Sequence, residues 1–296
     1  MFSSKKSEAL LANIRENKTL TRGEKLNLIV ELSIPSILAQ ITTVLMFFID
    51  ASMVGHLGTE ASASIGLVES TTWLLGSVTA AASMGFSVQV AHFIGANDFV
   101  KARQVFRHGL ICTLMLSVVI VFIALFIYQP LPFWLGGTSD IARDASLYFL
   151  VFGLAMPFMQ LASLTGAMLK CSGNMHIPSV ISVGMCVMDV VFNYFFIYVL
   201  HLGVLGAAFG TATAFLIGSL LQAYFAIFRN KILALGQDHE PFRWMSNYVK
   251  NALKIGAPMA AQSILMSGAQ IVSIIIVAPL GKVAIAANTF AITAES

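Results

Sequence analysis

The chain has 296 residues, of which 57% are hydrophobic and only 10% are charged, and its mean hydropathy is +0.84. Soluble domains carry about 25% charged residues, so this composition excludes a soluble globular protein. The net charge of +3 does not indicate a nucleic-acid partner, because the basic residues fall in loops between apolar runs and form no patch. We therefore expect a polytopic α-helical membrane protein that has the lipid bilayer as a partner and binds no nucleic acid.

Residues 1–27 are polar and of mixed charge, and they lack the apolar core and the small-residue cleavage site of a signal peptide. We expect a cytoplasmic tail here, with a short helix lying on the membrane between Leu10 and Leu28. Apolar runs that are long enough to cross a bilayer follow it. They cover 28–54, 63–94, 105–129, 143–170, 178–200, 204–228 and 253–279, and an eighth begins after Lys282.

The basic residues are divided unevenly between the two sets of loops. If the amino terminus is cytoplasmic, fifteen of the 17 Lys and Arg residues fall in inner segments. Only Arg143 and Lys282 fall in outer segments. Cytoplasmic loops of membrane proteins are enriched in Lys and Arg. We therefore predict a multi-pass protein of the plasma membrane, the inner membrane in a bacterium, with a cytoplasmic amino terminus.

An internal repeat is visible at an offset of 223 residues. Pro35, Leu57, Gly58 and Ala63 recur as Pro258, Leu280, Gly281 and Ala286. Six predicted helices separate the two stretches, so both begin with the same orientation and form a parallel repeat. We expect an amino-terminal six-helix lobe at 28–228, a cytoplasmic interfacial linker at 229–252 and the start of a carboxy-terminal lobe at 253–296. The chain is then part of a protein of about 450 residues with twelve helices.

Two carboxylates lie where charges are rare. Asp50 follows an uncharged run from Ile34 to Ile49, and Asp189 lies about 16 Å along its span at ~1.5 Å per residue. A charge inside a bilayer is costly and usually faces a cavity, a partner or a transported ion. Lys and Arg lie within three residues of a span end and not deeper, so none is placed to neutralise Asp189. Asp189 is therefore protonated, holds a cation, or alternates between these states as a cation-coupled transporter requires. For Asp50 the alternative is a solvated helix end.

Polar and small residues share one helix face in three spans, at i, i+3 and i+4 spacing. The stripes are Gln40, Thr43, Phe47 and Asp50; Glu69, Thr72, Gly76, Thr79, Ser83 and Ser87; and Ser182, Cys186, Asp189 and Asn193. Helix packing is the alternative for the small and hydroxyl residues, but it does not account for the carboxylates.

The chain carries no pattern of an enzyme or of a metal site. The three cysteines have no metal-ligand spacing, and five of the six histidines, His108 among them, fall at predicted helix ends or loops. Hydrolase and nucleotide-binding motifs do not appear in the sequence. We expect neither an enzyme, nor a bound metal, nor a cofactor.

Several motifs resemble those of the multidrug and toxic compound extrusion transporters. They are Ile34-Pro35, Asp50-Ala-Ser-Met-Val-Gly-His-Leu-Gly58, Ala91-His-Phe-Ile-Gly-Ala96, Gly173-Asn-Met-His-Ile-Pro178, Leu202-Gly-Val-Leu-Gly-Ala-Ala208 and Ala278-Pro-Leu-Gly281. The resemblance implies twelve helices in two six-helix lobes, and export of cationic and aromatic drugs in exchange for Na⁺ or H⁺.

The resemblance also implies roles for particular residues. Asp50 and Asp189 match the aspartates of a cation site in the amino-terminal lobe, but the asparagine expected four residues before Asp189 is Met185 here. Asn193, one turn later, could replace it. The glutamate that the NorM-like branch places in helix seven is Met266 here, which leaves Gln262, Gln270 and Glu295 as polar candidates. The candidates for the substrate cavity are Gln40, Thr43, Phe47, Glu69, Thr72, Gln262 and Glu295.

These observations predict a monomeric antiporter that is coupled to H⁺ or Na⁺ and exports amphipathic, often cationic drugs or metabolites by alternating access. A related lipid or polysaccharide flippase and a channel are the alternatives. Flippases usually line their cavity with Arg and Lys to bind phosphate, and the predicted spans carry these residues only within three residues of their ends.

Overall fold

The computed structural model describes residues 10, 13, 21–236 and 243–295; at residues 290 and 292–295 only the backbone is described. The described residues form helices and turns, without strands. Seven helical segments are long and apolar enough to cross a membrane, which confirms the predicted all-α membrane class. The elements are α2 (Arg22–Gly55), α3 (Thr59–Gly95), α4 (Phe99–Ile127), α5 (Leu131–Trp134), α6 (Ser139–Cys171), α7 (His176–Tyr194), η1 (Phe195–Val199), α8 (Val204–Tyr224), η2 (Phe225–Arg229), α9 (Ser246–Val277), η3 (Ala278–Leu280) and α10 (Lys282–Glu295).

The first spanning helix starts earlier than its apolar run. Thr21 and Glu24 form a capping box, in which the Thr21 N–H donates to the Glu24 carboxylate (2.9 Å) and the Thr21 hydroxyl accepts from the Glu24 N–H (3.4 Å). This cap starts α2 at Arg22, so the polar residues before Leu28 form its first turns. Most of the tail in which we expect a membrane-lying helix, before Thr21, lies outside the described residues.

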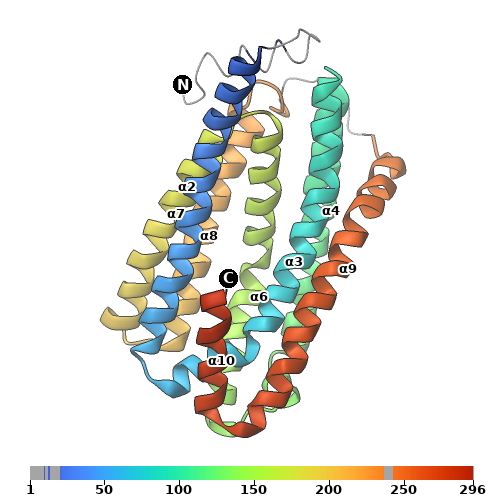
Figure 1. The fold of residues 1–296 in the computed structure, drawn as a ribbon. Coiled ribbons are helices and arrows are strands. Elements are labelled where there is room, and N and C mark those ends of the chain that lie inside the picture. The colour runs from blue at the N-terminus through green and yellow to red at the C-terminus, as the bar shows by residue number, and fades with distance from the viewer. Residues whose placement is uncertain (1–9, 11–12, 14–20, 237–242, 296) are drawn as a thin grey trace.

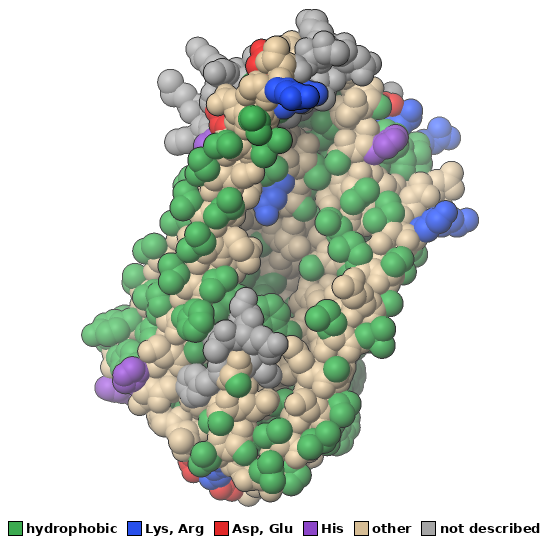
Figure 2. Space-filling view, in the orientation of Figure 1, with side chains coloured by type: hydrophobic (Ala, Val, Ile, Leu, Met, Phe, Trp, Pro, Cys, Tyr) green, Lys and Arg blue, Asp and Glu red, His purple; other side chains and the backbone are tan. Residues whose placement is uncertain are grey.

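The helices pack in two groups around α6 (Figure 1). On one side α2, α7 and α8 lie together, and on the other side α3 packs against α4, α9 and α10. Helix α6 contacts both groups, through α8 on one side and through α3 and α4 on the other. Two segments end in a π-helical turn, η1 after α7 and η2 after α8. In the space-filling view the face between α2 and α9 is hollowed (Figure 2).

The bundle has two ends, named here by the features they carry. The linker end holds residues 230–236 and 243–245, and the Lys282 end holds the turns at 56–58, 128–138, 201–203 and 278–281. Figure 1 shows the beginning of α2 at the linker end, with the α9–α10 turn at the opposite end. Helix α10 starts at that opposite end and runs toward the middle of the bundle, along α3.

The repeat seen in the sequence appears as one turn built twice. Gly58 precedes α3 with φ +110°, and Gly281 precedes α10 with φ +100°, a backbone conformation that favours glycine. Gly66 and Thr289 are separated by the same offset of 223 residues, and a side chain at Gly66 would overlap the Thr289 hydroxyl. Two residues at equivalent positions of the expected repeat therefore meet where α3 packs against α10.

His108 differs from its predicted place at a helix end. Asp98 caps α4, which therefore begins at Phe99 and encloses His108 in its interior. The imidazole is fully buried, and its Nε2 accepts a hydrogen bond from the Met245 N–H (2.9 Å). Arg103 also contributes here, because it donates to the Ile232 carbonyl (2.8 Å). One face of α4 thus binds the backbone of the segment that leads into α9.

Candidate functional site

The predicted cation-site residues meet inside the bundle. The side-chain amide nitrogen of Asn193 donates to Asp50 Oδ1 (2.8 Å) and to Asp189 Oδ2 (3.1 Å). Asp189 and Asn193 are one turn apart on α7, and Asp50 reaches them from α2. Asp189 is 0% exposed and Asn193 is 1% exposed. One amide therefore joins a fully buried carboxylate of α7 to a half-buried carboxylate of α2.

A glycine on α8 makes room for this bridge. A Cβ at Gly210 would overlap Asn193 Oδ1 and would lie 2.8 Å from both Cγ and the backbone nitrogen of Asn193. Helix α8 can approach α7 at this level only because the side chain is absent. Two turns earlier on α7, Met185 fills the space above another α8 glycine, Gly218. Met185 thus packs between helices, and the amide of the site comes from Asn193.

Two further polar residues surround the carboxylates. Thr211 of α8 lies close to the Asp189 carboxylate. Tyr148 of α6 lies close enough to Glu69, Asp50 and Asp189 to experience their charges. The carboxylates therefore face oxygen-bearing side chains from α6 and α8 as well as the Asn193 amide.

Two buried oxygen atoms of the site have no hydrogen-bond donor among the described residues. They are Asp189 Oδ1 and Asn193 Oδ1. Buried acceptors of this kind are normally satisfied by a donor, a water molecule or an ion. Carboxylate and amide oxygens are ligands that hard cations prefer, and a carboxylate can also take up a proton. The described residues contain no group of three or more His, Cys, Asp or Glu side chains that could hold a metal ion, so a cation here would depend on amide and hydroxyl oxygens too.

The substrate-cavity candidates on α2 and α3 are only partly gathered. Phe47 of α2 contacts Trp73 of α3, with ring centroids 5.3 Å apart, and the Glu69 carboxylate lies near Trp73. The Thr72 hydroxyl donates to the Glu69 backbone carbonyl (2.7 Å). Glu69, Phe47 and Trp73 therefore form one acidic and aromatic group on adjacent helices.

The remaining candidates lie elsewhere. Gln40 and Gln262 are exposed on α2 and α9, and the half-buried Thr43 donates to the Ala39 carbonyl of its own helix (3.0 Å). The side chain of Glu295 lies outside the described part of the structure. These four residues remain candidates on the basis of the sequence alone.

The carboxy-terminal part of the α3 stripe serves helix packing. The hydroxyls of Thr79, Ser83 and Ser87 donate to backbone carbonyls of α3, and all three residues are buried. Ser83 also accepts a hydrogen bond from Gln160 of α6 (2.7 Å). The packing alternative therefore accounts for these hydroxyl residues.

Four contributors were missed from the sequence: Trp73, Tyr148, Gly210 and Thr211. Trp73 follows Glu69 by one helical turn, so the spacing rule could have included it. The other three lie on α6 and α8, and their roles depend on which helices are neighbours. A single sequence carries no direct signal for that.

The fold and the buried carboxylates together define a multi-pass α-helical membrane protein with a polar site inside its bundle. The family model MatE matches residues 35–195, more than half of the chain. The chain belongs to this family, the multidrug and toxic compound extrusion family that its motifs resemble.

Individual relatives agree with this assignment. The chain is 23% identical over 255 residues to the multidrug export protein MepA of Staphylococcus saprophyticus, covering 86% of this chain and 56% of that protein. It is 22% identical over 272 residues to the probable multidrug resistance protein NorM of Thermotoga maritima, covering 90% and 58%. The chain thus spans less than two thirds of the length of these relatives.

Solved structures show the same architecture. An inward-facing multidrug resistance MATE family transporter of the MOP superfamily superposes with a TM-score of 0.78 at 25% identity, covering 88% of this chain and 59% of that one. A MOP superfamily transporter from Pyrococcus furiosus superposes with a TM-score of 0.79 at 24% identity, covering 91% and 57%.

Proposed function

We propose that the chain provides the first lobe and the start of the second lobe of a multidrug efflux transporter. The protein exports amphipathic, often cationic compounds in exchange for Na⁺ or H⁺ by alternating access. It is a monomer in the plasma membrane, with the linker end cytoplasmic. Membership in the MatE family supports export, and the lopsided distribution of basic residues supports the orientation. The lobe boundaries at 28–228, 229–252 and 253–296 belong to this proposal.

The bridge of Asn193 between Asp50 and Asp189 is the observation that carries cation coupling. Two neighbouring carboxylates in a buried site repel each other when both are ionised. A cation or a proton in the site removes this repulsion and lets α2 stay close to α7. Occupancy of the site therefore changes how two helices of the first lobe pack, and a ligand that binds one arrangement better shifts the population toward it.

The acidic and aromatic group of Glu69, Phe47 and Trp73 supports an amphipathic cation as the exported compound. A carboxylate attracts the positive charge, and aromatic rings bind both apolar surface and cations. This group and the cation site both include residues of α2, and Tyr148 lies near carboxylates of both. Competition between drug and coupling ion would follow from this closeness, as an antiporter requires.

Everted membrane vesicles that contain the full-length protein test this function. The Na⁺ gradient and the pH gradient are imposed separately. We expect drug uptake into the vesicles with one of the two gradients and little uptake with the other. Asp50→Asn and Asp189→Asn should each abolish the coupled component. Asp144→Asn, which removes an exposed carboxylate of α6, is the matched control and should retain it. If both buried variants transport as well as the control, the site assignment is wrong.

The same vesicles separate an antiporter from a channel. Antiport predicts a flux that saturates with drug concentration and stops when the driving gradient is collapsed. A flux that continues down the drug's own gradient without saturation would favour a channel instead.

A further inference from the structure

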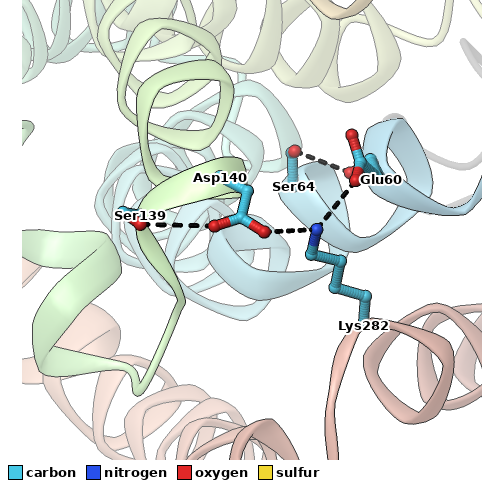
Figure 3. A network of polar contacts seen from close by, with 5 residues as sticks. All are labelled: Glu60, Ser64, Ser139, Asp140 and Lys282. Carbon is cyan, nitrogen blue, oxygen red and sulfur yellow. Dashed lines mark hydrogen bonds and ion pairs between the residues drawn. The ribbon is translucent and has the colours of Figure 1, made fainter.

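One lysine joins three helices at the Lys282 end. Figure 3 shows Lys282 of α10 between two carboxylates that come from different helices. Its Nζ lies 2.7 Å from Glu60 Oε1 on α3 and 2.5 Å from Asp140 Oδ2 on α6. The Ser139 hydroxyl donates to the other Asp140 oxygen (3.2 Å). The three charged residues therefore tie the start of α10 to the starts of two helices of the six-helix unit.

The position of the lysine is unfavourable for its own helix. Lys282 is the first residue of α10, where the helix dipole is positive and a cation is disfavoured. Glu60 and Asp140 lie in the first turns of α3 and α6, where the dipole favours carboxylates. The lysine is thus stabilised by its two partners and not by α10. The hydrogen bonds that Lys282 donates to Asp140 and then to Glu60 raise its pKa above the usual value, so the ammonium stays charged at physiological pH.

The ion pairs lie where the two repeat units meet. Two turns further along the same pair of helices, α10 touches α3 at the Gly66–Thr289 contact. A separation of α10 from α3 at this end would have to break the ion pairs first, because they lie outermost. Lys282 belongs to the second unit, and both of its carboxylate partners belong to the first.

We propose that Lys282, Glu60 and Asp140 form an outer latch, which holds the second unit against the first at the Lys282 end and must open when the transport path faces outward. The proposal rests on the proposed function and orientation, which place this end outside. The latch is weak enough to open in each cycle, because its side chains are partly exposed at 26% for Lys282, 68% for Glu60 and 52% for Asp140.

Removal of the lysine should both abolish the two ion pairs and leave two carboxylates that repel each other. In Lys282→Met two carboxylates from different helices are left close together with no cation between them, so repulsion favours the open state. Exposed ion pairs and their loss change equilibria modestly, so we expect the ratio of closed to open molecules to fall about three- to tenfold. Lys282→Arg keeps the charge and should keep the closed state.

Pulsed electron paramagnetic resonance distances test the latch on the full-length protein in lipid nanodiscs. Spin labels are placed at Gln129 in the first unit and at Leu280 in the second, two exposed sites at this end, after the native cysteines are replaced. We expect Lys282→Met to increase the long-distance population at the expense of the short one. Arg143→Met, which removes an exposed basic side chain near the start of α6 at the same end, is the matched control and should leave the distribution unchanged.

Two results would overturn the latch. One is a Lys282→Met distribution equal to that of the unmodified protein, and the other is an equal shift in Arg143→Met. If Lys282→Met does not fold, the double variant Glu60→Gln, Asp140→Asn provides the second test, and it should also increase the long-distance population. The spin-label distances can be measured without any transport. An absent drug flux would therefore count against the proposed function, whereas the latch is tested by the distances alone.

Discussion

Substitution of Gly210 by alanine should disturb the proposed cation site without changing either carboxylate. The added Cβ would overlap Asn193 Oδ1 and would lie 2.8 Å from the Asn193 backbone nitrogen. The backbone of α7 cannot move aside alone, so either α8 retreats from α7 or the Asn193 amide rotates away. Either change weakens the two hydrogen bonds that join Asp50 to Asp189.

The expected cost follows from these contacts. Each hydrogen bond contributes about 0.5–1.5 kcal/mol, so the loss of both costs about 1–3 kcal/mol. Overpacking a helix contact costs a similar amount. For a domain of this size, 1 kcal/mol shifts the Tm by roughly 2–4 °C. We therefore expect the Tm of Gly210→Ala to fall by roughly 2–12 °C.

The assay is thermal unfolding of the purified protein with and without the coupling ion. Gly184→Ala is the matched control on α7, because nothing lies within 4 Å of a Cβ built there. The control should keep its Tm or gain slightly, since alanine favours a helix over glycine. The reasoning is refuted if Gly210→Ala unfolds at the same temperature as Gly184→Ala and responds equally to the ion.

Two further substitutions test the contacts that position α9. Gly85→Ala places a Cβ 3.0 Å from the Ala252 carbonyl carbon, so α3 and α9 must separate and the Tm should fall by several degrees. Gly76→Ala is the control on the same helix. It should not lower the Tm, because nothing lies within 4 Å of a Cβ built there. Equal Tm values for these two variants would contradict the close contact. His108→Phe removes the acceptor of the Met245 N–H, and the unsatisfied group costs about 1–3 kcal/mol. Limited proteolysis should then cleave the linker faster. An unchanged cleavage rate would show that this hydrogen bond does not hold the linker in place.

Much of the fold could be predicted because hydrophobic length is a direct signal. The apolar runs gave the number of spans, but capping decides where a helix starts. Thr21 and Asp98 start α2 and α4 about six residues before the apolar runs begin. The π-helical turns η1 and η2 lie at the carboxyl ends of apolar runs, and η2 ends on Arg229. Nothing in the hydrophobic pattern there distinguishes an α turn from a wider one.

The proposed cation site could be predicted in part from the sequence. Asp50 and Asp189 are conspicuous because a buried charge is costly, and the i, i+4 spacing places Asn193 beside Asp189. The pairing of α2 with α7 could not be derived, because it depends on Gly210 and on the packing of α8. In the sequence Lys282 stood out only as one of two basic residues in the outer segments. Its ion pairs could not be predicted, because Glu60 and Asp140 are 222 and 142 residues away in the sequence.

The central claim is that Asp50, Asp189 and Asn193 form the coupling site. Equilibrium binding tests it most directly, as ²²Na⁺ bound to the purified full-length protein and as protons released when the drug binds. One of the two signals should be present in the unmodified protein, absent in Asp50→Asn and Asp189→Asn, and retained in Asp144→Asn. A full signal in Asp189→Asn would contradict the account, because it would place the coupling cation elsewhere.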